Sequence, residues 1–488
     1  MTSTTERIEI SGVEVSPDHF IGGERVAGDD HFEDISPIDG RVIAEVSRAG
    51  EAEVDRAVRA AHDAFPDWAA LGPAGRAPYL HRLADLIDEN VDCLAAVENA
   101  DMGMLLRSLR ARVISRGARN YRSYADLAVA YEERDWRSQG TWNRVQRMPA
   151  GPAAVITPWN APFMLSTWKT APALAAGCTM VLKPAEWSPL SCSLLGDLIS
   201  EAGFPPGVFN IVQGFGGEAG AALVAHPLLR RISFTGSPET GRLIGVAAAQ
   251  NLVPFTAELG GKGPLIVFED ADLDAAARKA AGQYDDSGQV CLAGTRLLVQ
   301  RSVADEFMEK FHGFADEHIL GDPREDATTI SPLIHPDHLE RVEGFVERAR
   351  ADGQKILRGG RRSDAGPLFY EPTLIEPSSN DAEVVQKEVF GPVLTIQTFE
   401  DEEEAVALAN STRYGLSGIV YTASLGRADR IGRRVRAGVV WVNTFLVRDL
   451  TAPFGGMGIS GIGREGGDYA LDFYSELKSL QILEGSVG

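Results

Sequence analysis

The feature that most constrains this fold is a regular alternation of short apolar runs with longer helical patterns over residues 153–250. Apolar runs of four or five residues predict buried strands, and apolar residues at helical spacing follow each run. The strands are expected at AAVIT, TMVLK, VFNIV and RISFT, and the helices over 163–175, 189–202, 217–225 and 239–250. Such βα units form a parallel sheet with helices on both faces, which predicts a doubly wound α/β domain.

A second series of the same kind begins near residue 264. Its strands are expected at PLIVF, RLLVQ, PVLTIQTF, SGIVYT and GVVWVN. A chain of 488 residues also exceeds what one hydrophobic core usually organises. We therefore expect an α/β fold of two doubly wound, Rossmann-like domains, the first from 1–125 and 148–258 and the second from 259–445.

Other segments fall outside both series. Long amphipathic patterns over 51–130 predict a helical subdomain, whereas RVQRM and LKSLQIL are extended. An extended edge segment can pair with another chain. We predict a small β arm for oligomerisation from 126–147 and 470–488, with 446–469 returning to the first domain near the active site.

Composition narrows the choice of partners. A net charge of -22 repels nucleic acid and anionic membranes. No apolar stretch approaches the ~20 residues of a membrane span, and MTSTTERIEI lacks the pattern of an export signal. The four cysteines show neither metal-ligand nor redox-pair spacing. We expect a cytoplasmic protein with reduced thiols, no metal and a small-molecule partner.

Cys291 lies in the most informative short stretch, SGQVC. Glycine and a small polar residue beside it leave the thiol approachable, although an isolated cysteine is usually inert core. Glu258 closes the strand PFTAELGG at its carboxyl end, where α/β sheets place their active sites. It is a candidate general base, and its ordinary alternative is a solvated residue or a salt-bridge partner. Asn160 follows AAVIT in TPWN, where its amide could donate to an oxyanion or simply form a turn.

Three further patterns suit a nucleotide. Lys183 and Glu186 end the strand TMVLK with a cation and a carboxylate, a spacing that suits a ribose diol or a surface ion pair. The turn at 234–237, FTGS, leads into a helix whose N–H groups could approach a pyrophosphate. Gly216 and Gly220 belong to another glycine-rich turn.

The combination of motifs resembles the aldehyde dehydrogenase superfamily in order and spacing over nearly the whole chain. The motifs are PWN at 158–160, KPAE at 183–186, FTGS at 234–237, ELGGK at 258–262, GQVC at 288–291, EVFGPV at 388–393 and PFGG at 453–456. The resemblance implies that Cys291 attacks an aldehyde while Asn160 and the Cys291 N–H hold the oxyanion. It implies that Glu258 activates water, which disfavours transfer to coenzyme A. Cys291 is then expected to be more reactive than Cys93, Cys178 or Cys192.

The resemblance also implies a dinucleotide cofactor. The positions that match cofactor contacts in the family are Ile156, Trp159, Lys183, Glu186, Gly216, Gly220, Phe234, Gly236, Ser237, Leu259, Glu388 and Phe390. A carboxylate at Glu186 repels a 2′-phosphate, so NAD is favoured over NADP. Lys169 and Glu465 match a possible proton relay. Homodimers or homotetramers are typical of the family.

Within the superfamily, the chain is most similar to semialdehyde dehydrogenases of aromatic ring cleavage. The similarity lies in 50–69, 163–177 and 441–467. It implies that Arg116 and Arg448 hold substrate carboxylates, although Arg116 could instead be a solvated residue of an arginine-rich helix. Three alternatives remain: an enzyme for neutral aromatic or aliphatic aldehydes, a coenzyme A-acylating enzyme, and a non-catalytic binding or structural protein on the same scaffold.

Overall fold

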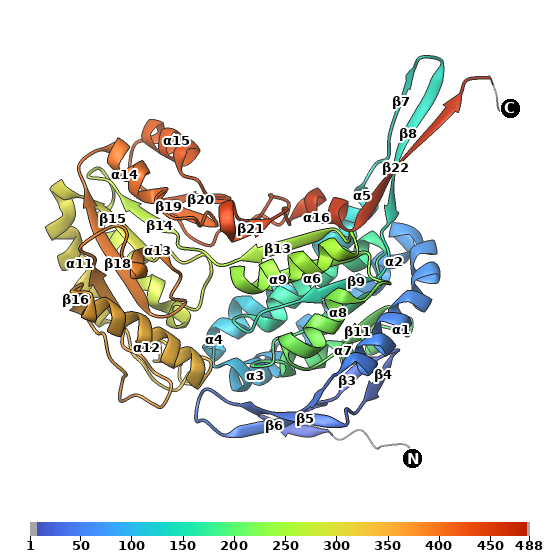
Figure 1. Cartoon of the computed structure of the whole chain (residues 1–488), viewed down its shortest axis with the longest axis horizontal. Coiled ribbons are helices and arrows are strands. Elements are labelled where there is room, and N and C mark those ends of the chain that lie inside the picture. The colour runs from blue at the N-terminus through green and yellow to red at the C-terminus, as the bar shows by residue number, and fades with distance from the viewer. Residues whose placement is uncertain (1–6, 486–488) are drawn as a thin grey trace.

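An eight-stranded sheet forms the centre of the first α/β unit in the computed structural model, which describes residues 7–485 (Figure 1). Its strand order is β21-β13-β12-β9-β10-β11-β3-β4. Five strands run parallel and lie where the apolar runs predict them: β9 (Ala153–Ile156), β10 (Met180–Lys183), β11 (Phe209–Ile211), β12 (Arg231–Gly236) and β13 (Phe255–Leu259). The parallel order confirms the doubly wound topology of the first series.

The helices that connect these strands also follow the predicted pattern. They are α6 (Pro162–Ala176), α7 (Leu190–Glu201), the π-helical turn η2 (Gly216–Gly220) with α8 (Ala221–Ala225), and α9 (Pro238–Gln250). β10, the next strand along the chain, lies beside one edge of β9, whereas the later strand β12 lies beside its other edge. The carboxyl ends of β9 and β12 therefore flank a topological switch point, where open α/β sheets bind ligands.

The N-terminal region contains short strands that no pattern in the sequence indicated. β3 (His19–Ile21) pairs antiparallel with β11, and β4 (Glu24–Val26) extends the sheet further. Two hairpins complete the region, β1 (Ile8–Ile10) with β2 (Val13–Val15) and β5 (Asp30–Ile35) with β6 (Val42–Arg48). Strands of three residues are too short to display a two-residue periodicity.

The amphipathic segment over 51–130 forms helices that pack onto the first sheet. They are α1 (Glu51–Ala70), α2 (Gly72–Glu89), α3 (Val91–Met102), α4 (Leu106–Ser108), the π-helical turn η1 (Leu109–Val113) and α5 (Ile114–Ala130). Gly117 allows α5 to approach α6 closely, because a β-carbon there would lie 2.8 Å from the Phe163 ring. No helix among residues 7–485 is long and apolar enough to cross a membrane.

The second α/β unit has a seven-stranded sheet in the order β16-β17-β18-β15-β14-β19-β20. Its strands are β14 (Pro264–Val267), β15 (Arg296–Gln300), β16 (Lys355–Arg358), β17 (Thr373–Glu376), β18 (Val393–Phe399), β19 (Ser417–Tyr421) and β20 (Val439–Val442). Its helices are α10 (Leu273–Ala281), α11 (Ala304–Asp316), α12 (Pro336–Ala351), α13 (Glu383–Gln386), α14 (Glu402–Ala409) and α15 (Leu425–Arg434). Only β16 runs antiparallel to its neighbour, so the second predicted series is also confirmed as a parallel sheet.

A three-stranded arm projects from the first unit (Figure 1). It consists of β7 (Arg134–Ser138), β8 (Thr141–Pro149) and β22 (Ser475–Leu483). The arm is narrower than the predicted segments, because 126–130 completes α5 and 470–473 belongs to α16 (Gly467–Phe473). Before α16, the chain pairs β21 (Gly461–Ile462) with β13, close to Glu258.

Candidate active site

Cys291 follows a tight loop at the end of the 3-10 segment η3 (Gly282–Gly288). Asp286, Ser287 and Gly288 adopt positive φ angles of 52°, 53° and 67°. A left-handed backbone costs energy in residues other than glycine and persists only where the surroundings enforce it. At Gly288 a β-carbon would lie 2.2 Å from the carbonyl oxygen of Gly391, so only glycine fits there.

Gln289 fastens this loop to the chain opposite. Its side-chain amide donates to the carbonyls of Asp286 at 3.2 Å and Pro332 at 3.3 Å, and its oxygen accepts from the Ile334 N–H at 3.0 Å. These bonds satisfy a buried polar side chain and limit movement of the backbone that leads to Cys291. Gln289 was not among the predicted site residues, although it lies inside the GQVC motif.

Asn160 reaches the same loop from the other α/β unit. It follows β9, and its Nδ2 donates to the backbone carbonyl oxygen of Gln289 at 2.8 Å. The residue is half-buried, as is Cys291. The structure thus brings the predicted amide to the loop of the predicted nucleophile, and Nδ2 has a second hydrogen that this bond does not use.

The surroundings of the Cys291 thiol oppose its ionisation. Burial, with a smaller contribution from Glu388 and Glu258, raises the pKa of Cys291 to about 12. Arg448 opposes this shift and does not outweigh it. Burial also raises the pKa of Cys178 and Cys192, while Cys93 is exposed. In the free protein the Cys291 thiol is therefore protonated at neutral pH, and attack requires a base or an added charge nearby.

Glu258 is a buried carboxyl group at the predicted edge of the sheet. It lies on β13 with 6% of its surface exposed, and neither carboxyl oxygen has a hydrogen-bond partner in residues 7–485. Burial and the neighbouring charge of Glu465 raise the pKa of Glu258 well above its ordinary value. A carboxyl group with free oxygens and a raised pKa is suited to accept a proton near neutral pH.

Lys169 and Glu465, the predicted relay pair, form a buried ion pair of 2.5 Å beside Glu258. Lys169 on α6 also donates to the Ser233 hydroxyl at 3.0 Å. Glu465 accepts from the Trp168 indole N–H at 2.5 Å. A connected polar network therefore lies beside the unpartnered carboxyl group of Glu258.

The predicted cofactor residues gather at the switch point between β9 and β12. Phe234 on β12 pairs in register with Ile156 on β9, and Gly236 pairs with Leu259 on β13. The hydroxyl of Ser237 caps α9 by accepting from the Thr240 N–H at 3.1 Å. The three strand ends and the start of α9 therefore meet at one edge of the sheet.

Lys183 and Glu186 form an ion pair of 3.4 Å after β10. The pair is not a surface one, because only 2% of Lys183 is exposed, and burial lowers the pKa of its ammonium group. Gly220 lies next to it, since a β-carbon there would be 3.5 Å from the Lys183 side chain. Gly216 begins the same π-helical turn and faces open space. A buried cation, a carboxylate and close glycines are a donor and acceptor set that fits a nucleotide diol.

Glu388 and Phe390 come from the second unit and meet the first unit across the site. Glu388 accepts from the Gly261 N–H at 2.9 Å, and burial raises its pKa to about 7. The rings of Phe390 and Trp159 meet edge to face at 5.3 Å. Phe390 has a φ of 62°, and His338 Nε2 lies 2.8 Å from its carbonyl oxygen.

Arg116 and Arg448 converge from separate segments. Arg116 is on α5 and Arg448 follows β20, yet each guanidinium lies over the ring of Trp168, at 5.8 Å and 5.1 Å from its centroid. Neither arginine has an ion pair within residues 7–485. Burial, followed by the charge of Arg448, lowers the pKa of Arg116 to about 10, and Cys291 is among the charges that act on Arg448. Two cations without an ion pair therefore lie side by side, and the charge of Arg448 acts on Cys291.

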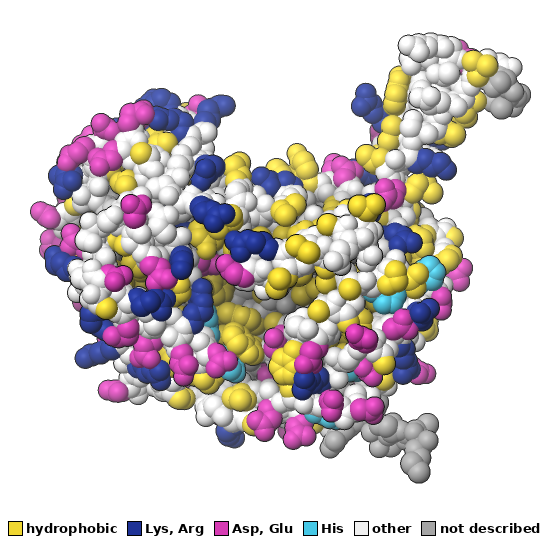
Figure 2. Space-filling model, viewed as in Figure 1, with side chains coloured by type: hydrophobic (Ala, Val, Ile, Leu, Met, Phe, Trp, Pro, Cys, Tyr) yellow, Lys and Arg dark blue, Asp and Glu magenta, His cyan; other side chains and the backbone are white. Residues whose placement is uncertain are grey.

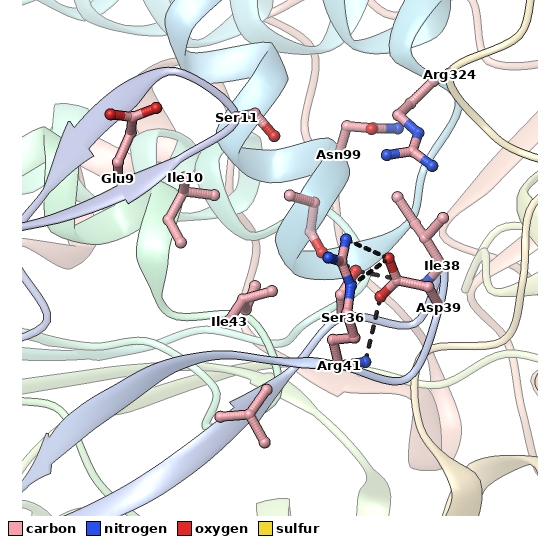
Figure 3. A pocket seen from close by; sticks show the side chains of 12 residues that line it. Glu9, Ile10, Ser11, Ser36, Ile38, Asp39, Arg41, Ile43, Asn99 and Arg324 are labelled. Atoms are coloured by element: carbon pink, nitrogen blue, oxygen red, sulfur yellow. Dashed lines mark hydrogen bonds and ion pairs between the residues drawn. The ribbon is translucent and has the colours of Figure 1, made fainter.

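A cavity of about 290 Å³ lies elsewhere, among the N-terminal hairpins (Figure 3). Arg41 and Asp39 form an ion pair of 2.6 Å inside it, and Arg324 lines another side. Arg324 is itself paired with Asp322 at 2.5 Å. This cavity contains none of the predicted site residues, and its Arg41, Asp39 and Arg324 are each held in an ion pair.

Comparison with known proteins agrees with this geometry. The sequence pattern described as "Aldehyde dehydrogenase family" matches residues 25–480. The chain belongs to the aldehyde dehydrogenase family. It is 42% identical over 478 residues to the 2-hydroxymuconic semialdehyde dehydrogenase of Pseudomonas sp. (strain CF600), covering 95% of this chain and 98% of that protein. It is 41% identical over 461 residues to the 5-carboxymethyl-2-hydroxymuconate semialdehyde dehydrogenase of Escherichia coli, covering 93% and 98%.

Solved structures resemble this aldehyde dehydrogenase along nearly its whole length. The indole-3-acetaldehyde dehydrogenase of P. syringae, solved with NAD+, has a TM-score of 0.94 at 37% identity and covers 96% of this chain and 97% of its own. The betaine aldehyde dehydrogenase of Staphylococcus aureus, also solved with NAD+, has a TM-score of 0.94 at 36% identity, with 96% coverage of both chains. The fold predicted from the alternation of strands and helices is therefore shown.

Proposed function

We propose that this aldehyde dehydrogenase oxidises a carboxylated semialdehyde to the corresponding acid, with NAD as the hydride acceptor. The observation that carries the proposal is the convergence of two unpaired arginines, Arg116 and Arg448, on the site that contains Cys291. Two of the relatives named above act, by their names, on muconate-type semialdehydes. Guanidinium groups without a protein carboxylate are available to bind a substrate carboxylate through two parallel hydrogen bonds.

The residues beside Cys291 support a two-stage reaction. Cys291 Sγ attacks the carbonyl carbon and passes its proton to Glu258, whose carboxyl oxygens have no hydrogen-bond partner within the described residues and whose charge acts on Cys291. The alkoxide is held by the second Nδ2 hydrogen of Asn160 and by the backbone N–H of Cys291. NAD, when bound, would accept the hydride of that carbon, so that the acyl group would remain on the sulfur as a thioester. Once its first proton has left, Glu258 takes a proton from water, whose oxygen attacks the thioester carbon. The carbon–sulfur bond then breaks and Glu258 returns the proton to the sulfur, which releases the acid and the thiol.

The residues at the switch point fit the cofactor. Lys183 and Glu186 are positioned to bind ribose hydroxyls, and the glycines beside them admit a close backbone approach. Glu388 and Phe390 are proposed to hold the second ribose and the nicotinamide ring against Trp159. The carboxylate of Glu186 disfavours the 2′-phosphate of NADP by charge repulsion.

Lys169 and Glu465 are proposed to move the proton away from Glu258. Their ion pair is buried and hydrogen-bonded to the Ser233 hydroxyl. Because the charges of both residues act on Glu258, a change in the charge of Glu258 changes the electrostatic energy of the pair. The presence of Glu258 also favours hydrolysis over transfer of the acyl group to coenzyme A.

An aldehyde panel tests the proposed reaction. Muconic semialdehyde and sorbaldehyde share a conjugated six-carbon chain, and only the former has a carboxylate. We expect NADH to form from both, with a lower KM for muconic semialdehyde and higher activity with NAD than with NADP. No NADH from any aldehyde would indicate a non-catalytic protein, and equal KM values would favour an enzyme for neutral aldehydes.

Arginine variants test the substrate assignment. Arg448→Ala and Arg116→Ala should each raise KM for muconic semialdehyde by roughly tenfold or more relative to KM for sorbaldehyde. Arg119→Ala is the matched control, since Arg119 is an exposed residue of the same helix. Equal changes in KM for both aldehydes would contradict the proposal that the arginines bind the substrate carboxylate.

We further propose that the protein assembles as a homodimer or homotetramer in the cytoplasm, with the arm as part of the interface. Apolar side chains lie exposed along the arm, as Figure 2 shows, among them Trp136, Met148 and Leu477. The exposed Leu243 and Val246 of α9 offer a second apolar surface. Sedimentation of the wild-type protein and of a Leu477→Arg variant measures how much the arm contributes to oligomer formation. We also propose that the first α/β unit binds the cofactor and that the second, which contains Cys291, is the catalytic unit.

A further inference from the structure

We propose that Trp168 is the residue that sets the preference for carboxylated aldehydes, because it holds the guanidinium groups of Arg116 and Arg448 in position. This inference rests on the proposed carboxylate role of the two arginines. Trp168 acts through them as a positioning residue and need not touch the substrate. Trp168 lies in 163–177, one of the stretches that carry the resemblance, and was not among the predicted site residues.

Trp168 stands between the two arginines. It lies on α6 with 6% of its surface exposed. The guanidinium carbon of Arg448 is 5.1 Å from its ring centroid and that of Arg116 is 5.8 Å away. Phe454 covers Arg448 as well, at 3.8 Å. These distances lie within the ~6 Å range in which an aromatic face attracts a cation.

No carboxylate among residues 7–485 forms an ion pair with either arginine, and Glu258 and Glu465 act on Arg448 only through their charge. The two arginines repel each other, which is why Arg448 helps to lower the pKa of Arg116. Nε of Arg116 donates to the Asn120 side chain at 3.1 Å, and its terminal nitrogens have no hydrogen-bond partner within residues 7–485. A carboxylate partner would neutralise the site, whereas an aromatic face keeps both guanidinium groups charged and able to bind an incoming anion.

The indole ring is itself fixed. Its N–H donates to Oε2 of Glu465 at 2.5 Å, while Oε1 of Glu465 binds Lys169 at 2.5 Å. A charge-assisted bond to a buried carboxylate restrains the plane of the ring. The arginines are thus placed before the substrate arrives, which lowers the entropy lost on binding.

A plain packing role for Trp168 makes a different prediction. Loss of packing alters the site for every aldehyde, so KM for muconic semialdehyde and for sorbaldehyde would change together. Loss of a support for the arginines raises KM only where a carboxylate must be bound. The ratio of the two KM values is therefore the readout that separates the roles.

The first experiment compares Trp168→Leu and Trp168→Phe with the wild-type enzyme. We expect Trp168→Leu to raise the ratio of KM for muconic semialdehyde to KM for sorbaldehyde by roughly tenfold. Trp168→Phe, which retains an aromatic face, should raise it less. Thermal unfolding of each variant shows whether it is folded, and Trp168→Phe is the smaller change if the leucine variant does not fold.

The second experiment is a double-mutant cycle. Trp168→Phe is combined with Arg116→Ala and Arg448→Ala together. If Trp168 acts through the arginines, the tryptophan substitution raises the KM ratio in the wild-type background and has no further effect once both arginines are absent.

The outcomes separate the two proposals. No preference for muconic semialdehyde in the wild-type enzyme overturns both. A preference that is lost in the arginine variants but unchanged in Trp168→Leu and Trp168→Phe keeps the proposed function and overturns the role of Trp168. Additive effects in the cycle overturn that role too, since they show that Trp168 acts independently of the arginines.

Discussion

Asn160 donates its side-chain amide to the backbone carbonyl of Gln289, two residues before Cys291, and so joins the two α/β units at the reactive loop. Asn160 follows β9 of one sheet, whereas Gln289 precedes β15 of the other. The bond positions the loop and leaves one amide hydrogen unused. The proposed stabilisation of the oxyanion and the placement of the loop would therefore depend on the same side chain.

Asn160→Ala is expected to lower kcat by about 10²–10³-fold, since one oxyanion donor is lost. KM should change far less, because the amide contributes mainly once negative charge develops on the oxygen. Asn160→Asp is the matched control, with similar size and no amide donor, and it should be at least as slow. Steady-state kinetics with sorbaldehyde measure both, and an unchanged kcat in either variant would contradict the assignment.

Glu258→Gln should lower kcat by about 10²–10⁴-fold, because the general base is removed while the size of the side chain is kept. Glu258 is the proposed proton acceptor in both stages, so formation of NADH in the first turnover should slow together with steady-state turnover. Rapid-mixing absorbance measures the first turnover. A fast burst of NADH followed by slow turnover would show that another group takes the Cys291 proton, and an unchanged kcat would show that another group activates the water.

The pH profile should depend on Glu465. Its charge helps to raise the pKa of Glu258, so Glu258 remains protonated to a higher pH than an ordinary glutamate and activity is lost as pH falls through that pKa. Glu465→Gln removes a like charge, which lowers the pKa of Glu258 and moves the acid limb of kcat to lower pH. An acid limb that moves to higher pH would reverse the inferred sign.

Alkylation of Cys291 should accelerate steeply with pH. With a pKa of about 12, its thiolate fraction rises about tenfold per pH unit between pH 7 and 9. The rate at which iodoacetamide abolishes activity should follow this slope, in a Cys93→Ser background that removes the exposed thiol. A plateau below pH 9 would mean that the free enzyme already holds a thiolate.

Gly288→Ala should destabilise the fold by roughly 2–4 kcal/mol, because it combines a positive φ with a clash against the Gly391 carbonyl. Gly140→Ala is the matched control, with a φ of 73° and no atom within 4 Å of the added β-carbon. Chemical unfolding measures the free energy of unfolding of both variants and of the wild-type protein. Equal losses of unfolding free energy in the two variants would show that the cost at Gly288 comes from the positive φ alone and not from the clash with Gly391.

Glu186→Gln should reduce the difference in kcat/KM between NAD and NADP. Without the carboxylate, repulsion of the 2′-phosphate is removed, so kcat/KM for NADP should rise by about tenfold relative to NAD. Asp197→Asn, a charge-neutralising change at a carboxylate on α7, is the control. A ratio that stays constant in Glu186→Gln would place the selectivity elsewhere.

Much of the scaffold could be predicted from local sequence patterns. The apolar runs at 153–157 and 179–183 indicated strands, and both lie in the first sheet. Burial of a parallel strand on both faces leaves such a run in the sequence itself. The three-residue strands β3 and β4 leave no such pattern, because β3 joins the sheet by pairing with the distant β11 and β4 by pairing with β3.

The sequence by itself determined the order of strands and helices and the identity of Cys291, Glu258 and Asn160 as candidates, because these follow from local periodicity and motif order. Only the tertiary structure decided their electrostatics. Burial and neighbouring charges raise the pKa of Cys291, where the motif had suggested a reactive thiol. The meeting of Arg116 and Arg448 on Trp168 joins segments far apart in the chain. Desolvation and charge proximity depend on packing between distant segments, which no local pattern of residues records.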